Sequence, residues 1–212
     1  MRFCIQKGGD MLDKFQIVKD IIIKSNGVAK TSEFTSCGLT TYDVKRLHDK
    51  GLIEKIRHGV YGLPNANNIT EEKLIQTVLP EVVVCLESAL FRYGYSDFTP
   101  RKWSIAVPRS MSMTKINSID IPFNIFYLPI EKLYLGKTTA DFNGTELPVY
   151  DRDKTICDCF KYQSKIDNEL FNKAINAYVA DDKKNLANLA KYAKEMRVYK
   201  KVMTIMEVML NG

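Results

Sequence analysis

The 212-residue chain lacks any run of the roughly 18 apolar residues that a membrane-spanning helix needs, which excludes a helical membrane protein. Its first ten residues contain no apolar core of a signal peptide, so secretion is not expected. The five cysteines are odd in number and scattered, which does not suit a disulfide framework. Together these absences predict a cytoplasmic protein.

Recognisable catalytic signatures are also missing. The sequence contains no Gly-rich phosphate loop, no Gly-x-Ser-x-Gly elbow and no His-Glu-x-x-His pair. It has only two histidines, His48 and His58. Cys157 and Cys159 point about 200° apart on a helix, so they are not expected to share a zinc ion. We therefore expect a protein that is not an enzyme and that needs no metal and no cofactor.

One acidic cluster leaves an alternative open. Asp151, Asp153 and Asp158 could together hold a divalent metal ion. A simpler interpretation is that Asp151 or Asp153 caps a helix and that Asp158 makes a buried hydrogen bond or ion pair. We favour the structural interpretation.

What is present is typical of a globular protein with a modest positive charge. Hydrophobic residues make up 45% of the chain and charged residues 26%, and the formal net charge is +6. The positive charge lies mainly toward the two ends, whereas the middle is close to neutral. This balance permits a polyanionic partner but does not require one.

The first 65 residues predict a winged helix-turn-helix over residues 11–64. Apolar residues at helical spacing indicate helices over 12–25 and 31–36. Thr40 and Asp43 fit the capping pattern that opens a further helix over 40–50. Two short β-rich runs around a basic, Gly-containing turn then predict a hairpin.

The helix over 40–50 is the expected recognition helix, with Val44 and Leu47 facing the core. Lys45 or Arg46 would donate to guanine or to phosphate, and the basic hairpin tip would reach an adjacent phosphate or minor groove. The expected DNA-binding residues are Thr40, Thr41, Tyr42, Lys45, Arg46, Arg57 and His58. The alternative is that this module only docks a protein or has a structural role.

Two runs in this region carry a family resemblance. Gly51-Leu52-Ile53-Glu54-Lys55-Ile56, followed by Gly59-Val60-Tyr61-Gly62-Leu63-Pro64, resembles the N-terminal domain of AbiEi-type antitoxins. These are the DNA-binding members of bacterial type IV toxin–antitoxin modules, which act in abortive phage infection. The resemblance continues in Glu87-Ser88-Ala89-Leu90, in the residues 149–158 and in the residues 186–193.

The rest of the chain predicts an α+β domain over residues 69–212. Strand-like runs cover 103–108 and 123–128, and Asn143-Gly144 is a hairpin signal. From Asp153 onward the hydrophobic period is helical, which indicates a helical bundle at the end of the chain. Residues 111–121 give no assignable pattern.

A second basic surface is expected near the C-terminus. Lys194, Arg197 and Lys201 fall at i, i+3 and i+7, so they share one face if a single helix runs through them. Such a face could bind phosphate or receive a partner, although a charged run of this kind is more often simply solvated.

The resemblance implies a sequence-specific antitoxin that represses its own operon by binding double-stranded DNA at inverted repeats. It also implies a nucleotidyltransferase-like toxin as functional partner, opposed without a stable contact. A different hypothesis is neutralisation by direct complex formation with that toxin, motivated by the basic C-terminal face and the Met-rich last helix. A third is an enzyme that modifies the toxin, supported only by the acidic cluster.

Overall fold

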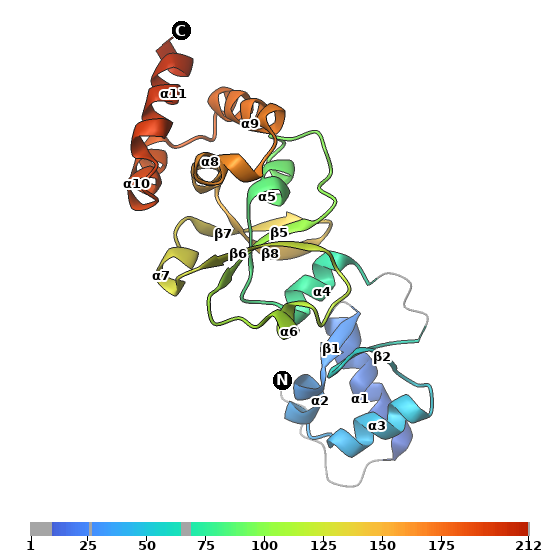
Figure 1. Cartoon of the computed structure of the whole chain (residues 1–212). Coiled ribbons are helices and arrows are strands. Elements are labelled where there is room, and N and C mark those ends of the chain that lie inside the picture. Colours follow the sequence, from blue (N-terminus) through green and yellow to red (C-terminus); the bar gives the residue numbers. More distant parts are fainter. Residues whose placement is uncertain (1–9, 26, 65–68, 212) are drawn as a thin grey trace. The chain divides into compact units, whose positions relative to one another are not determined.

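The computed structural model describes residues 10–25, 27–64 and 69–211, which divide into two compact units (Figure 1). The first unit extends to Pro80 and also takes in Met113–Asp120. The second consists of Glu81–Ser112 and the residues from Ile121 onward. The expected domain boundary between residues 64 and 69 remains a prediction, since the helix that follows this linker clusters with the first unit.

The first unit combines short helices with one small sheet. Its elements are α1 (Met11–Lys24), β1 (Val28–Lys30), α2 (Thr31–Ser36), α3 (Thr41–Asp49), β2 (Glu54–Arg57), β3 (Val60–Gly62), α4 (Glu71–Val78) and α6 (Met113–Ile116). The three strands pair antiparallel in the order β1-β3-β2. This order of elements agrees with the expected winged helix-turn-helix, in which the β2–β3 hairpin is called the wing.

A single apolar core explains why these helices pack together. Val18 and Ile22 of α1 are buried against Phe34 of α2 and against Val44 and Leu47 of α3. Burying each of these side chains contributes about 1.5–3 kcal/mol. The apolar residues that recur at helical spacing in the sequence are therefore the ones that α1, α2 and α3 bury against one another.

The second unit is built on a five-stranded mixed sheet in the order β6-β5-β4-β8-β7. Strand β5 runs parallel to β6 and β4 runs parallel to β8, whereas the β4–β5 and β7–β8 pairs are antiparallel. Asn143 and Gly144 form the turn between β7 and β8 with φ angles of 50° and 80°, which suit the expected two-residue hairpin. The strands are β4 (Val83–Val84), β5 (Trp103–Pro108), β6 (Phe123–Leu128), β7 (Lys137–Phe142) and β8 (Thr145–Tyr150).

Helices supply the rest of the second unit, and α5, α8, α9, α10 and α11 lie on one side of its sheet (Figure 1). The helical elements are α5 (Leu86–Arg92), α7 (Ile130–Leu133), α8 (Arg152–Lys161), η1 (Gln163–Lys165), α9 (Asn168–Ala180), α10 (Leu186–Glu195) and α11 (Tyr199–Asn211). The expected α+β fold class, with helices at the end of the chain, is confirmed.

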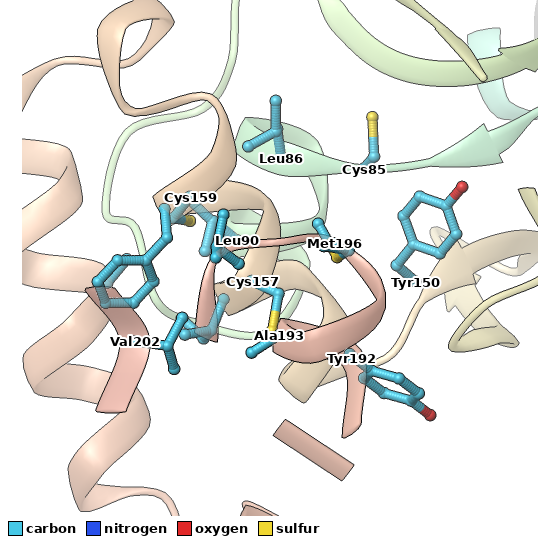
Figure 2. Close-up of a cluster of buried hydrophobic side chains, with 14 of the residues drawn as sticks. Cys85, Leu86, Leu90, Tyr150, Cys157, Cys159, Tyr192, Ala193, Met196 and Val202 are labelled. Carbon is cyan, nitrogen blue, oxygen red and sulfur yellow. The ribbon is translucent and has the colours of Figure 1, made fainter. Parts of the chain in front are cut away.

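Helix α8 forms the centre of this unit. All its residues from Asp153 to Phe160 are buried, and Figure 2 shows its two cysteines among side chains from α5, α10 and α11. Burial raises the pKa of the Cys157 thiol to about 12, so this thiol stays protonated at neutral pH. None of the described helices is long and apolar enough to cross a membrane.

The condition for a shared basic face, a single helix running through Lys194 and Lys201, is not met. Helix α10 ends at Glu195, and α11 begins at Tyr199. Arg197 lies between them with φ 62°, in the left-handed region that interrupts a right-handed helix. The i, i+3, i+7 spacing therefore does not place these basic residues on one helical face.

Candidate nucleic-acid interface

Helix α3 presents one polar face to solvent. Thr41, Tyr42, Lys45 and Arg46 are exposed, whereas Val44 and Leu47 are 1% and 0% exposed. This division follows from helical periodicity, because apolar residues three apart face the core and the residues between them face outward. The outward orientation expected for this set is what the structure has.

The N-terminus of α3 is fixed by a capping box. The Asp43 backbone N–H donates to Thr40 Oγ1 at 3.1 Å, and Asp43 Oδ2 accepts from the Thr40 backbone N–H at 2.9 Å. The Thr40 hydroxyl also donates to Asp43 Oδ2 at 2.7 Å. Thr40 is exposed, but its hydroxyl is engaged in starting the helix, so it is less available for a base contact than expected.

Asp43 also links α3 to α1. Lys14 Nζ donates to Asp43 Oδ1 at 2.8 Å. The hydrogen bond from Lys14 and the one from the Thr40 backbone lower the pKa of the Asp43 carboxyl to about 2. The carboxylate is therefore ionised throughout the physiological range, and it links α3 to α1 through Lys14.

Tyr42 and Arg46 lie one turn apart on the exposed face. The Tyr42 side chain is 66% exposed, and the Arg46 guanidinium carbon lies 5.8 Å from the centroid of its ring. This is within the range of a cation–π contact. At an exposed site such a contact contributes about 0.5–1 kcal/mol, which favours arrangements of Arg46 beside the ring.

The wing presents its two expected residues differently. His58 is exposed at the turn of the β2–β3 hairpin. Arg57 is half-buried instead: its Nη1 donates to Ser118 Oγ, and its Nε is buried without a hydrogen-bond partner among the described residues. Burial lowers the pKa of the Arg57 guanidinium. Arg57 is thus directed toward the Met113–Asp120 segment, and its DNA contact remains a prediction.

The tip of the wing is tied to the start of α2. The Thr31 backbone N–H donates to the Gly59 carbonyl at 2.9 Å, and the Thr31 hydroxyl donates to the same oxygen at 3.3 Å. Because this oxygen belongs to the turn, the bonds fix the position of His58 relative to the helices. The wing is therefore tied to α2, which shares an apolar core with α3.

The three residues of the expected second basic surface, Lys194, Arg197 and Lys201, are all exposed in the second unit. Lys194 Nζ lies 5.1 Å from the centroid of the Tyr199 ring, across the break between α10 and α11. Of the three basic residues, Lys194 lies in the last turn of α10, Arg197 lies between the two helices and Lys201 lies in α11. A phosphate-binding role for them remains a prediction.

The three aspartates of the acidic cluster each have a structural partner. Asp151 caps α8 by accepting from the Lys154 backbone N–H at 2.8 Å. Asp153 Oδ1 accepts from the Tyr178 hydroxyl at 2.7 Å, and both oxygens of Asp158 accept from Lys154 Nζ at 2.8 Å. These contacts support the structural interpretation of the cluster.

Two contacts at the interface could not be derived from the sequence. The Lys14–Asp43 pair joins residues 29 positions apart, and the Arg57–Ser118 pair joins residues 61 positions apart. The Tyr42–Arg46 contact, by contrast, has a sequence signal, because residues at i and i+4 of a helix are neighbours.

Comparison with known proteins gives two findings. The fold is similar to the crystal structure of the RV2827C protein from Mycobacterium tuberculosis, with a TM-score of 0.57 and 12% sequence identity. The match covers 86% of this chain and 71% of that chain, and at this identity it shows the fold alone. No curated protein is a significant match in sequence.

The second finding concerns the sequence of the first unit. Residues 16–64, which contain α2, α3 and the wing, match the family model described as a transcriptional regulator, AbiEi antitoxin. This range contains the runs at 51–56 and 59–64 noted above, whereas the runs at 87–90, 149–158 and 186–193 lie outside it. Over these residues the chain is therefore similar to AbiEi antitoxins of the transcriptional-regulator class.

Proposed function

We propose that the chain binds duplex DNA sequence-specifically through α3 and the wing, and that it represses the operon of a type IV toxin–antitoxin module. The observation that carries the proposal is the exposed face of α3, where Tyr42, Lys45 and Arg46 project from a helix fixed at its N-terminus. A capped helix with a polar outer face has the geometry that the major groove admits. Binding of this kind needs no catalytic group, so the proposal assigns the chain no enzymatic activity.

Affinity and sequence choice come from different contacts in this proposal. Lysine and arginine contacts to phosphate release bound counterions and supply affinity, which falls as the salt concentration rises because each released counterion then gains less free energy. Contacts to base edges at the outer face of α3 supply sequence choice. Two copies on an inverted repeat would occupy half-sites a helical turn, or a multiple of it, apart.

The decisive experiment removes two positive charges from α3. We expect Lys45→Ala with Arg46→Ala to weaken binding of the promoter duplex at least 10-fold and to reduce the slope of log affinity against log salt by about 1–2, according to whether one or both residues contact phosphate. Fluorescence anisotropy across a salt series measures both. Arg101→Ala with Lys102→Ala, a double change at exposed residues of the second unit, removes the same charge and should leave both unchanged. Equal losses in the two double variants would refute the assigned surface.

A second candidate function is neutralisation of a nucleotidyltransferase-like toxin by direct contact. It is favoured by apolar side chains of the last two helices, where Leu186, Met203, Met206 and Leu210 line a hollow of about 170 Å³. Val208, on the same helix, is 70% exposed. Co-purification with the toxin encoded beside this chain tests the proposal, and the lack of a complex at micromolar concentration would disfavour it.

A further inference from the structure

The Tyr42–Arg46 contact has a consequence for how bases are chosen. A tyrosine side chain that is 66% exposed leaves most of its ring in water, where it contributes nothing to the core. Its ring lies instead beside the Arg46 guanidinium, at 5.8 Å. Stacking uses the flat face of a guanidinium and leaves the N–H groups at its edge free to donate.

An arginine held in one orientation is better suited to a base contact than to a phosphate contact. A mobile cation binds any phosphate, and there is little to gain from fixing its orientation. Recognition of guanine needs two parallel N–H donors aimed at O6 and N7, so an oriented guanidinium loses less entropy on binding. The aromatic neighbour therefore favours base recognition by Arg46 over phosphate binding.

The rest of the exposed face agrees with base recognition. Asp49 is exposed and lies one turn beyond Lys45 on the same face. A carboxylate directed at the phosphate backbone is repelled by it, whereas at a base edge it accepts from the amino group of cytosine. The negative charge of Asp49 would weaken a surface that bound only phosphate, so its presence on this face of α3 favours base recognition.

We propose that Arg46, oriented by Tyr42, reads one guanine in the major groove, and that Lys45 supplies a phosphate contact without base preference. The inference rests on the proposed DNA binding and deepens it by assigning sequence choice to one pair of side chains. Arg46 is the residue that touches the base, and Tyr42 is a positioning residue.

The test is selection of duplexes from a random pool by the full chain, followed by measurement of binding to the enriched duplex and to versions with each guanine replaced. Four variants are compared with the unaltered protein. Arg46→Lys keeps the charge but removes the two-donor edge, and Tyr42→Leu removes the ring. Tyr42→Phe keeps the ring and removes only the hydroxyl, and Lys45→Ala is the matched control for lost charge.

We expect the unaltered chain to prefer one guanine by about 10- to 100-fold over other bases at that position. Arg46→Lys should abolish this preference while keeping affinity for random duplex within about 3-fold. Tyr42→Leu should reduce the guanine preference, whereas Tyr42→Phe should retain it because the ring is still present. Lys45→Ala should weaken binding to all duplexes and reduce the salt slope by about 1 without changing the preference.

Four outcomes overturn the inference. Retention of the full guanine preference by Arg46→Lys would show that another group reads the base. Parallel behaviour of Arg46→Lys and Lys45→Ala, with no change in base preference, would show that Arg46 contacts phosphate only. Binding of duplex DNA with no preferred guanine refutes this inference alone, whereas failure to bind any duplex refutes the proposed function as well. Circular dichroism of each variant confirms that the exposed substitutions leave the fold intact.

Discussion

Asp43 combines two tasks in one carboxylate, since it closes the capping box of α3 and pairs with Lys14 of α1. Its pKa is about 2, below its ordinary value of 3.8. A lowered pKa means that the folded state prefers the ionised form, so the contribution to stability is complete above pH 4 and is lost as pH falls toward 2. The effect belongs to the acid side of the stability profile.

We expect Asp43→Asn to lower the free energy of unfolding at pH 7 by about 1–2 kcal/mol, allowing for solvent screening of the pair. The same substitution should cost less near pH 2, where about half of the native carboxylate is already protonated. Urea unfolding at the two pH values measures the difference. Asp49→Asn makes the same charge change at an exposed residue of α3 and serves as the control. An Asp43→Asn cost that does not vary with pH would contradict the ionic origin.

Local patterns in the sequence predicted much of the candidate interface. The Thr40–Asp43 spacing predicted the capping box, and Val44 and Leu47 were predicted to face the core, where they are buried. The half-buried environment of Arg57 was not predicted, because its partner Ser118 is distant in the chain and lies in a segment without a recognisable pattern. Burial by a distant segment is decided by tertiary packing, which a single stretch of sequence does not contain.

At the scale of elements, strong local signals succeeded and short or unusual ones failed. Asn143-Gly144 predicted the β7–β8 turn because both residues accept positive φ angles. Strand β1 has only three residues, Val28–Lys30, too few to show an alternating pattern. No glycine marks the break between α10 and α11, because Arg197 takes there the left-handed conformation that normally falls to glycine.

This break yields a prediction with a built-in control. Arg197→Gly should raise the free energy of unfolding by about 0.5–1 kcal/mol, because glycine adopts a φ of 62° without the steric cost borne by arginine. Lys191→Gly, at an exposed position inside α10, should lower it by about the same amount. Thermal and urea unfolding of both variants test the sign. Destabilisation by both would show that the Arg197 side chain contributes contacts that outweigh its backbone strain.

At the scale of the whole molecule, the chain places its proposed DNA-binding face in one unit and a buried ion pair at the centre of the other. Lys154 and Asp158 are 3% and 4% exposed, and Lys154 Nζ lies 3.9 Å from the centroid of the Tyr150 ring. Burial raises the pKa of the Asp158 carboxyl, and the charge of Lys154 opposes that rise. Removing either residue would therefore leave the other charge buried without a partner and would destabilise the fold.

Lys154→Met should accordingly lower the free energy of unfolding by about 3–5 kcal/mol, since it leaves Asp158 buried without a counter-charge. The double variant Lys154→Met with Asp158→Leu should recover most of this loss, because it removes both charges and fills the space with apolar atoms. Lys173→Met, which breaks the more exposed pair with Asp97, should cost less than about 1 kcal/mol. Urea unfolding measures all three, and anisotropy below the unfolding transition should show unchanged DNA affinity in each. A loss of DNA affinity in the folded Lys154→Met variant would show that the two units do not act independently, and a double variant no more stable than Lys154→Met would refute the unpaired-charge explanation.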